Sequence, residues 1–180
     1  MAKKVLIIST SLRSKSNSEI LAKECEKGAR DAGYDVELLS LRGKDIRFCI
    51  GCLSCQKTGS CVLKDDVPEI MSKVKDAEVI VFATPIYYYE MSGQMKTLLD
   101  RLNPLYDSDY RFRDIYMIAT AAEDESTTIE KAYNGLQGWV DCFEQAELKG
   151  YVFGGAINDT GDAAQDTEAL QQAYELARNL

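Results

Sequence analysis

Four of the six cysteines lie close together, in the pattern C-x2-C-x2-C-x5-C at Cys49, Cys52, Cys55 and Cys61. Thiolates at this spacing suit three chemistries: an iron–sulfur cluster, a structural zinc ion, or a redox-active C-x-x-C pair. Because no export signal is evident, we expect metal binding or redox chemistry before a disulfide framework. The other two cysteines, Cys25 and Cys142, fall on helical patterns, and we expect both to be small core residues.

A second group of chemically capable residues fills the stretch 9–18, which has five serines, Arg13, Lys15 and Asn17. It follows an apolar run and leads into a helical pattern. Hydroxyl groups, the free N–H groups of a helix N-terminus and a guanidinium together suit a phosphate, and the helix dipole adds to the attraction. The alternative is an ordinary serine-rich turn with a helix cap. Its place after the first apolar run favours phosphate binding.

A third stretch, 84–93, contains Pro85 followed by three consecutive tyrosines, Tyr87 to Tyr89. We expect Pro85 to end a strand, because proline has no N–H to donate. Three tyrosines in a row cannot all face one core, so at least one should be exposed and able to stack on a flat ring or pack in a dimer. Further along, small residues at 120–122 would let backbone approach a ring edge, and the acidic residues 123–125 should precede a helix.

The segments that must position these residues alternate between short apolar runs and longer amphipathic ones. Continuous apolar runs indicate strands buried on both faces, as in a parallel sheet covered by helices. The predicted strands are Lys4–Ser9, Asp35–Ser40, Glu78–Ala83, Asp114–Thr120 and Leu148–Gly154. Apolar stripes at helical spacing predict five helices, with Gly33 placed to end the first of them. The helices are marked by Ile20–Cys25, by a start at Asp66, and by the stripes Met91–Leu102, Ile129–Phe143 and Leu170–Ala177.

Five strands alternating with five helices predict an α/β fold: a flavodoxin-like, doubly wound, five-stranded parallel sheet of order 2-1-3-4-5 with helices on both faces. In such a sheet, ligands bind at the carboxyl ends of the strands. With 180 residues, we expect a single domain, 1–180. The longest irregular segment, 41–65, holds the clustered cysteines, and a loop of that length is usually functional.

Composition narrows the function further. With 21 basic and 29 acidic residues the net charge is −8, so we expect neither a nucleic-acid partner nor a membrane partner. No stretch approaches the roughly 20 apolar residues of a membrane span, so we expect a cytoplasmic protein. The chain has no histidine, which excludes histidine-dependent triads. No Gly-x-Gly-x-x-Gly motif and no P-loop follows a predicted strand, so neither a Rossmann dinucleotide site nor an NTPase is expected.

The segments STSLRSKSNS and ATPIYYYEMSGQMKTLLDRL resemble those of the NADPH-dependent FMN reductase family of flavodoxin-fold proteins, and the resemblance runs in order along essentially the whole chain. It implies that the first loop holds the FMN phosphate and that the second runs along the isoalloxazine ring. It also implies a homodimer, or a higher oligomer, with flavin near the subunit interface. The implied phosphate contacts are Ser11, Arg13, Ser16, Asn17 and Ser18, and the implied ring contacts are Pro85, Ile86, Tyr87 and Tyr88, followed by Thr120, Ala121 and Ala122.

The cysteine motif resembles that of the iron–sulfur flavoproteins, a branch of the same fold with a [4Fe–4S] cluster on such a loop; similar loops also occur in plain flavin reductases without a cluster. We therefore predict an FMN-dependent NAD(P)H oxidoreductase that passes electrons to a small-molecule acceptor such as a flavin or a quinone. One alternative is an electron carrier with FMN and a [4Fe–4S] cluster, reduced by ferredoxin. Another is a non-enzymatic thiol or metal sensor. Because the cofactor supplies the chemistry, we assign no catalytic acid or base.

Overall fold

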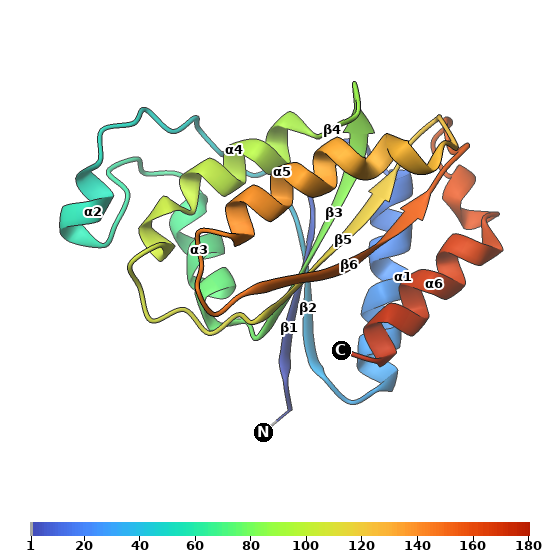
Figure 1. The fold of residues 1–180 in the computed structure, drawn as a ribbon, viewed down its shortest axis with the longest axis horizontal. Helices are drawn as coiled ribbons and strands as arrows, with labels where there is room; N and C mark the ends of the chain where they lie inside the picture. The colour runs from blue at the N-terminus through green and yellow to red at the C-terminus, as the bar shows by residue number, and fades with distance from the viewer. Residues whose placement is uncertain (1) are drawn as a thin grey trace.

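A computed structural model describes residues 2–180 as one twisted sheet between two layers of helices (Figure 1). The parallel strands are β1 (Lys4–Ser9), β2 (Asp35–Ser40), β3 (Val79–Tyr87), β5 (Asp114–Thr120) and β6 (Glu147–Gly154), in the order β2-β1-β3-β5-β6. Among the parallel strands this is the predicted order 2-1-3-4-5. A sixth strand, β4 (Glu90–Met91), was not predicted; it pairs antiparallel with the end of β3.

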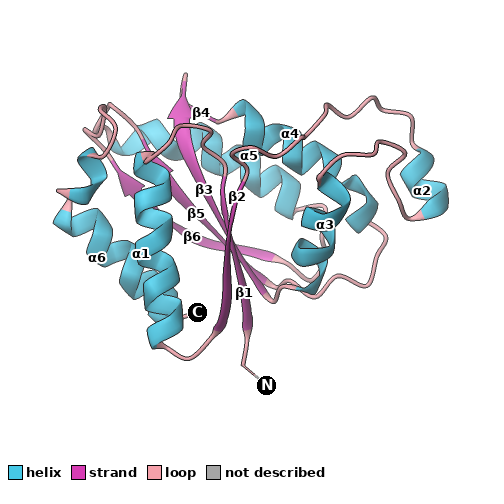
Figure 2. Ribbon diagram, turned by 180° about the vertical axis from the view of Figure 1, so that it is seen from behind, coloured by secondary structure: helices cyan, strands magenta, loops and turns pink. Residues whose placement is uncertain are grey.

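The helices cover both faces of the sheet, as predicted. One face carries α1 (Asn17–Asp31) and α6 (Thr167–Arg178), and the other carries α3 (Val67–Asp76), α4 (Gly93–Arg101) and α5 (Glu130–Val140) (Figures 1 and 2). A short helix, α2 (Ser54–Thr58), lies in the cysteine segment, which extends away from the sheet beyond α3 (Figure 2). No helix within residues 2–180 is long and apolar enough to cross a membrane.

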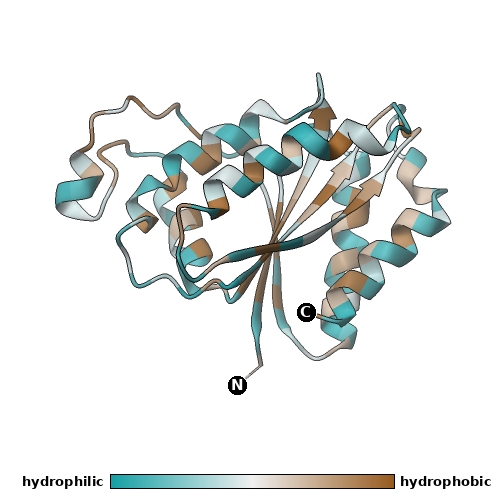
Figure 3. Ribbon diagram, in the orientation of Figure 1, coloured by the Kyte–Doolittle hydropathy of each residue, from teal (hydrophilic) through white to brown (hydrophobic). Residues whose placement is uncertain are grey.

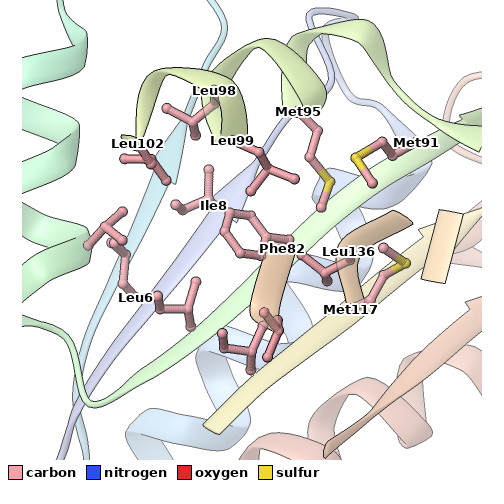
Figure 4. Close-up of a cluster of buried hydrophobic side chains, with 14 of the residues drawn as sticks. Leu6, Ile8, Phe82, Met91, Met95, Leu98, Leu99, Leu102, Met117 and Leu136 are labelled. Atoms are coloured by element: carbon pink, nitrogen blue, oxygen red, sulfur yellow. The ribbon is translucent and has the colours of Figure 1, made fainter. Parts of the chain in front are cut away.

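Each inner strand supplies side chains to two separate cores, which explains its unbroken apolar sequence. Leu6 and Ile8 of β1 pack on the side of α3, α4 and α5, whereas Val5 and Ile7 pack on the side of α1 and α6. Figure 4 shows Phe82 of β3 in the first core, among side chains of α4 and α5. The strands are correspondingly apolar and the outer helix faces polar (Figure 3). Burial on both faces therefore holds the sheet in a fixed register.

The prediction that Pro85 ends β3 was wrong. The strand runs on to Tyr87, and Pro85 pairs in register with Thr120 of β5. Backbone groups of successive residues point to opposite sides of a strand, and the Ala83 carbonyl accepts from Thr10 on the β1 side. The nitrogen of Pro85 therefore faces the same side, beyond the end of β1, where no ladder hydrogen bond is required.

The two isolated cysteines differ from each other. Cys25 is buried in α1 as predicted, and burial raises the pKa of its thiol to about 12, which makes it inert. Cys142 was wrongly predicted to be a core residue: it is exposed in the turn after α5. Its neighbour Trp139 instead fills the core position, packing against the rings of Phe112 and Phe143.

Gly28 allows α1 and α6 to pack closely, because a Cβ there would lie 2.2 Å from the backbone oxygen of Tyr174. We therefore expect Gly28→Ala to lower the free energy of unfolding by about 1–3 kcal/mol in urea titrations, as overpacking does. Gly138→Ala is the matched control, because Gly138 lies in α5 with open space around it. That control should raise stability by about 0.5–1 kcal/mol. Equal effects of the two changes would contradict the close packing of α1 and α6.

Candidate functional site

A cavity of about 210 Å³ opens at the carboxyl ends of β1, β3 and β5, where the strand order reverses. It brings together every residue predicted for the phosphate and ring contacts except Tyr88. Two further residues, Ile157 and Asn158 from the segment after β6, complete the lining. The residues that line it are Ser11, Arg13, Ser16, Asn17, Ser18, Pro85, Ile86, Tyr87, Thr120, Ala121, Ala122, Ile157 and Asn158.

One end of the cavity is the N-terminus of α1, where hydrogen-bond donors are left without partners. Ser16 caps the helix by accepting from the Glu19 N–H at 3.2 Å. Ser18 follows in the first turn; its hydroxyl is fully buried and has no hydrogen-bond partner among the described residues. A buried hydroxyl in that state is costly. The Ser18 hydroxyl and the free N–H groups of the first turn are donors of the kind that bind anions at helix N-termini.

The charge around this helix end is positive. Arg13 and Lys15 are exposed and form no ion pair within residues 2–180. Glu19, the acidic residue of the first turn, is buried, and its carboxylate pairs with Lys23 at 3.0 Å and with Arg42 at 3.9 Å. Both partners contact Oε1, whereas Oε2 is buried and has no hydrogen-bond partner among the described residues. Because Glu19 engages neither Arg13 nor Lys15, the two loop cations and the helix dipole remain available to an anion.

Asn17 lies in the cavity wall, but its side chain forms hydrogen bonds to the segment that follows β6. The amide nitrogen donates to the carbonyl of Asp159 at 2.8 Å, and the amide oxygen accepts from the backbone N–H groups of Gly161 and Ala163 at 3.0 and 3.2 Å. This side chain therefore fixes the segment after β6 against α1, which brings Ile157 and Asn158 to the cavity. The backbone N–H of Asn17 and the second hydrogen of its amide nitrogen are left to contact an anion.

The other end of the cavity is formed by the hairpin between β3 and β4. Ile86 pairs with Met91 and Tyr87 with Glu90, so that Tyr88 and Tyr89 alone form the turn. Both have positive φ, +52° and +66°, a geometry that normally selects Asn-Gly. Tyr88 is 99% exposed and does not line the cavity. Strained turns with bulky residues are concentrated at functional sites.

The hairpin is fastened to the rest of the site by hydroxyl groups. The Ser92 N–H donates to the Thr84 hydroxyl at 3.0 Å, and the Ser92 and Thr10 hydroxyls share a hydrogen bond of 3.0 Å. Tyr89 is held by Lys131, whose ammonium lies over its ring, and by Glu123, whose hydrogen bond raises the pKa of the Tyr89 hydroxyl. The strained turn therefore has a fixed position relative to the first loop.

The four clustered cysteines line a second cavity of about 260 Å³, together with residues of α4 and of the turn that follows it. Cys49 and Cys52 are exposed, and Cys55 and Cys61 are half-buried. A hydrogen bond from Ser54 lowers the pKa of the Cys52 thiol. The predicted metal ligands thus surround one space at the far end of α4 from the first cavity.

Within residues 2–180, no three His, Cys, Asp or Glu side chains converge on a point that one metal ion would occupy. Four thiolates on a tetrahedral zinc ion would lie within about 3.8 Å of one another, from a Zn–S distance of about 2.3 Å. The described loop is therefore more open than a formed zinc site. A cluster of four irons is larger than one ion and takes one thiolate at each corner. Four thiols around a common cavity are therefore better suited to an iron–sulfur cluster than to a single zinc ion.

A doubly wound parallel sheet with free hydrogen-bond donors at the N-terminus of its first helix and an aromatic hairpin at its switch point has the architecture of a flavodoxin-like protein. The chain belongs to the NADPH-dependent FMN reductase family, whose model matches residues 3–134. The predicted fold, family and oxidoreductase class are thereby confirmed.

Named relatives extend over nearly the whole chain. An iron–sulfur flavoprotein of Methanocaldococcus jannaschii is 29% identical over 98% of this chain and 95% of its own. A Bacillus subtilis protein named as an NAD(P)H-dependent FMN-containing oxidoreductase is 27% identical over 97% of both chains. Among solved structures, an NAD(P)H:quinone oxidoreductase of Methanothermobacter marburgensis has a TM-score of 0.76 over 99% of both chains at 16% identity, which shows the shared fold.

The backbone strain at Tyr88 makes a direct prediction. A left-handed conformation costs an ordinary residue about 1–2 kcal/mol, and asparagine tolerates it better. Because the exposed Tyr88 side chain has no packing to lose, we expect Tyr88→Asn to raise the free energy of unfolding by about 1 kcal/mol. Tyr106→Asn, at an exposed tyrosine with negative φ, is the control and should change stability by less than about 0.5 kcal/mol. Indistinguishable effects in urea unfolding would argue against strain in the turn.

Proposed function

We propose that the first cavity binds FMN, with the phosphate at the N-terminus of α1 and the isoalloxazine ring along the β3–β4 hairpin. The observation that carries this proposal is the buried, unpartnered hydroxyl of Ser18 at a helix end that faces the cavity. A bound phosphate would accept from that hydroxyl and from the free N–H groups of the first turn. The residues therefore fit the group that membership of the family implies.

Each part of the phosphate site has a distinct role. Ser11 and Ser16 are buried and present hydroxyl groups to the cavity, while their oxygens already accept from the N–H groups of Arg13 and Glu19. Their hydroxyl hydrogens remain free to donate to an anion. The exposed Arg13 guanidinium can close over the phosphate from the solvent side, which would add charge-assisted hydrogen bonds.

The ring side of the cavity has a different lining. Pro85 and Ile86 offer apolar surface, Tyr87 offers an aromatic edge, and Ala121 and Ala122 leave room for backbone to approach a flat ring. Bound FMN would supply the redox chemistry, accepting a hydride from NAD(P)H and delivering electrons to a small acceptor. The lining contains no carboxylate and no thiol, so the chain's own contribution is to position the ring and to exclude water.

A second candidate function keeps FMN and adds a [4Fe–4S] cluster on Cys49, Cys52, Cys55 and Cys61, which would make the protein an electron carrier reduced by ferredoxin. The observation that favours it is that all four thiols line one cavity. The relative from M. jannaschii is named an iron–sulfur flavoprotein, which supports it further. Membership of a reductase family does not favour the third alternative, a non-enzymatic sensor.

We also propose a homodimer, in which the partner subunit covers the hairpin. Tyr87 and Tyr88 expose 53% and 99% of their surface beside the cavity, and exposed aromatic residues are enriched in protein interfaces. A second copy of the chain on this surface would shield the ring side of the flavin from solvent. The cavity of one chain alone is small, about 210 Å³, in keeping with a site completed by a partner.

The function is tested by recording the visible spectrum of anaerobically purified protein reconstituted with FMN, before and after adding NADPH. We expect the oxidised flavin bands to bleach, and added quinone to restore them. Flavin bands that NADPH leaves unchanged, while reduced ferredoxin bleaches them, would instead support the iron–sulfur carrier. A protein that retains no FMN would overturn both.

The same samples test the phosphate site. Arg13→Gln should weaken FMN binding by about 10-fold or more, because a charge-assisted hydrogen bond contributes about 1.5–3 kcal/mol. At saturating FMN, bleaching by NADPH should remain. Arg111→Gln is the matched control, since Arg111 is also exposed but pairs with Glu78 far from the cavity. Equal FMN affinity in the two variants would contradict the assignment of Arg13.

A further inference from the structure

The cysteine segment is closed at its base by hydrogen bonds between its two ends, residues 45–47 and 64–66, which we call the neck. The N–H of Asp66 donates to the carbonyl of Asp45 at 3.0 Å, and the N–H of Asp45 donates to the Asp66 carboxylate at 2.7 Å. The N–H of Arg47 donates to the Asp65 carboxylate at 3.1 Å, and its guanidinium donates to the carbonyl of Lys64. The four cysteines therefore lie in a loop with a fixed base.

A buried arginine from α4 fills the neck. Arg101, the last residue of the helix, has a fully buried side chain that donates to both oxygens of Asp65, at 2.6 and 3.0 Å, and to the carbonyl of Arg47 at 2.6 Å. One guanidinium thus forms hydrogen bonds to both ends of the loop. A bidentate arginine–carboxylate pair has a defined geometry, and this one keeps the pKa of the Asp65 carboxyl below its usual range against the opposing effect of burial.

Arg101 has a second neighbour inside the loop. The Cys61 thiol is also a neighbour of its guanidinium. The Nε of Arg101 is buried and has no hydrogen-bond partner among the described residues. A buried guanidinium with an unpartnered N–H beside a thiol favours the thiolate form, which is the form that binds metals.

The turn after α4 contacts another of the four sulfurs. The side-chain amide of Asn103 donates to the Cys55 sulfur at 3.1 Å, and Asn103 lines the cysteine cavity. The two half-buried thiols, Cys55 and Cys61, are thus both approached by polar groups from the end of α4. The two exposed thiols, Cys49 and Cys52, are on the outer part of the loop.

We propose that Arg101 and Asn103 are positioning residues for a thiolate site. They hold the half-buried thiols of Cys61 and Cys55 in place as the first two ligands of a thiophilic metal ion or an iron–sulfur cluster. The exposed thiols of Cys49 and Cys52 then complete the ligand set. Groups that hydrogen-bond to metal ligands orient them and are needed for affinity. Arg101 also supplies positive charge where several thiolates gather at a helix C-terminus, whose dipole disfavours anions. This inference is independent of flavin binding.

The test is a titration of the full-length, reduced protein with Cd²⁺ alone, followed through its thiolate charge-transfer absorption. In the double variant Arg101→Met with Asp65→Asn, both buried charges are removed together, so no buried charge is left unpaired; Arg47, the other ion-pair partner of Asp65, is exposed to solvent. We expect its Cd²⁺ affinity to fall by about 10- to 100-fold, and the absorption per bound ion, which reports the number of thiolates, to decrease. Arg101→Lys keeps the positive charge but cannot donate two parallel hydrogen bonds to Asp65, so this variant should bind Cd²⁺ with intermediate affinity.

Two further variants keep the test decisive if the double variant folds poorly. Asn103→Ala changes an exposed residue and should weaken Cd²⁺ binding through Cys55, with an unaltered thermal melt. Lys57→Gln, which removes an exposed positive charge from the same loop, should bind Cd²⁺ like the natural sequence. Undiminished affinity and thiolate number in a folded double variant, or no difference between Asn103→Ala and Lys57→Gln, would overturn the proposal. FMN affinity measured on the same samples should be unchanged, which separates this result from a failure of the flavin site.

Discussion

The functional edge of this protein depends on an offset between two neighbouring strands. Pairing between β1 and β3 ends at Ser9 and Ala83, yet β3 pairs with β5 as far as Pro85 and itself continues to Tyr87. The first loop therefore leaves the sheet while its neighbour still extends past it, and a crevice opens between them. The N-terminus of α1 closes one side of that crevice and the β3–β4 hairpin closes the other. The groups proposed to contact the phosphate and the ring are thereby placed on one edge of the sheet.

The helix α4 connects the two chemically capable regions of the chain. At its N-terminus, Ser92 caps the helix and ties the hairpin to the first loop through Thr84 and Thr10. At its C-terminus, Arg101 closes the base of the cysteine loop. Between them, Met95, Leu98 and Leu99 anchor the helix in the core (Figure 4). Both regions are therefore attached to one helix that is anchored in the core, and this fixes the position of each region relative to the sheet.

Much of the fold could be predicted from the sequence, because burial on both faces leaves a simple signal. The predicted bounds of β1, β2 and β5 coincide with those in the structure. The error at Pro85 arose because the consequence of a missing N–H depends on which neighbour it would face, and that is set by where β1 ends. The exposure of Cys142 was likewise missed because a helical stripe does not show where the helix ends.

The candidate site could be predicted where its residues lie close together in the sequence. The first loop and the hairpin each have a distinctive composition, and their meeting follows from the parallel order of the strands. The contribution of Ile157 and Asn158 was missed, because it rests on the long-range hydrogen bonds of Asn17 to residues 159–163. The neck of the cysteine loop was missed for the same reason, since nothing near Arg101 in the sequence indicates Asp65 as its partner.

The central claim is that the N-terminus of α1 recognises the phosphate of the flavin. The most direct measurement compares the affinity of the flavin-free protein for FMN and for riboflavin, which differ only in that phosphate, by isothermal titration calorimetry. Two or more charge-assisted hydrogen bonds at about 1.5–3 kcal/mol each predict that FMN binds at least about 100-fold more tightly than riboflavin. Equal affinities would show that the buried hydroxyl of Ser18 and the positive loop do not hold a phosphate, and the account of the site would be wrong.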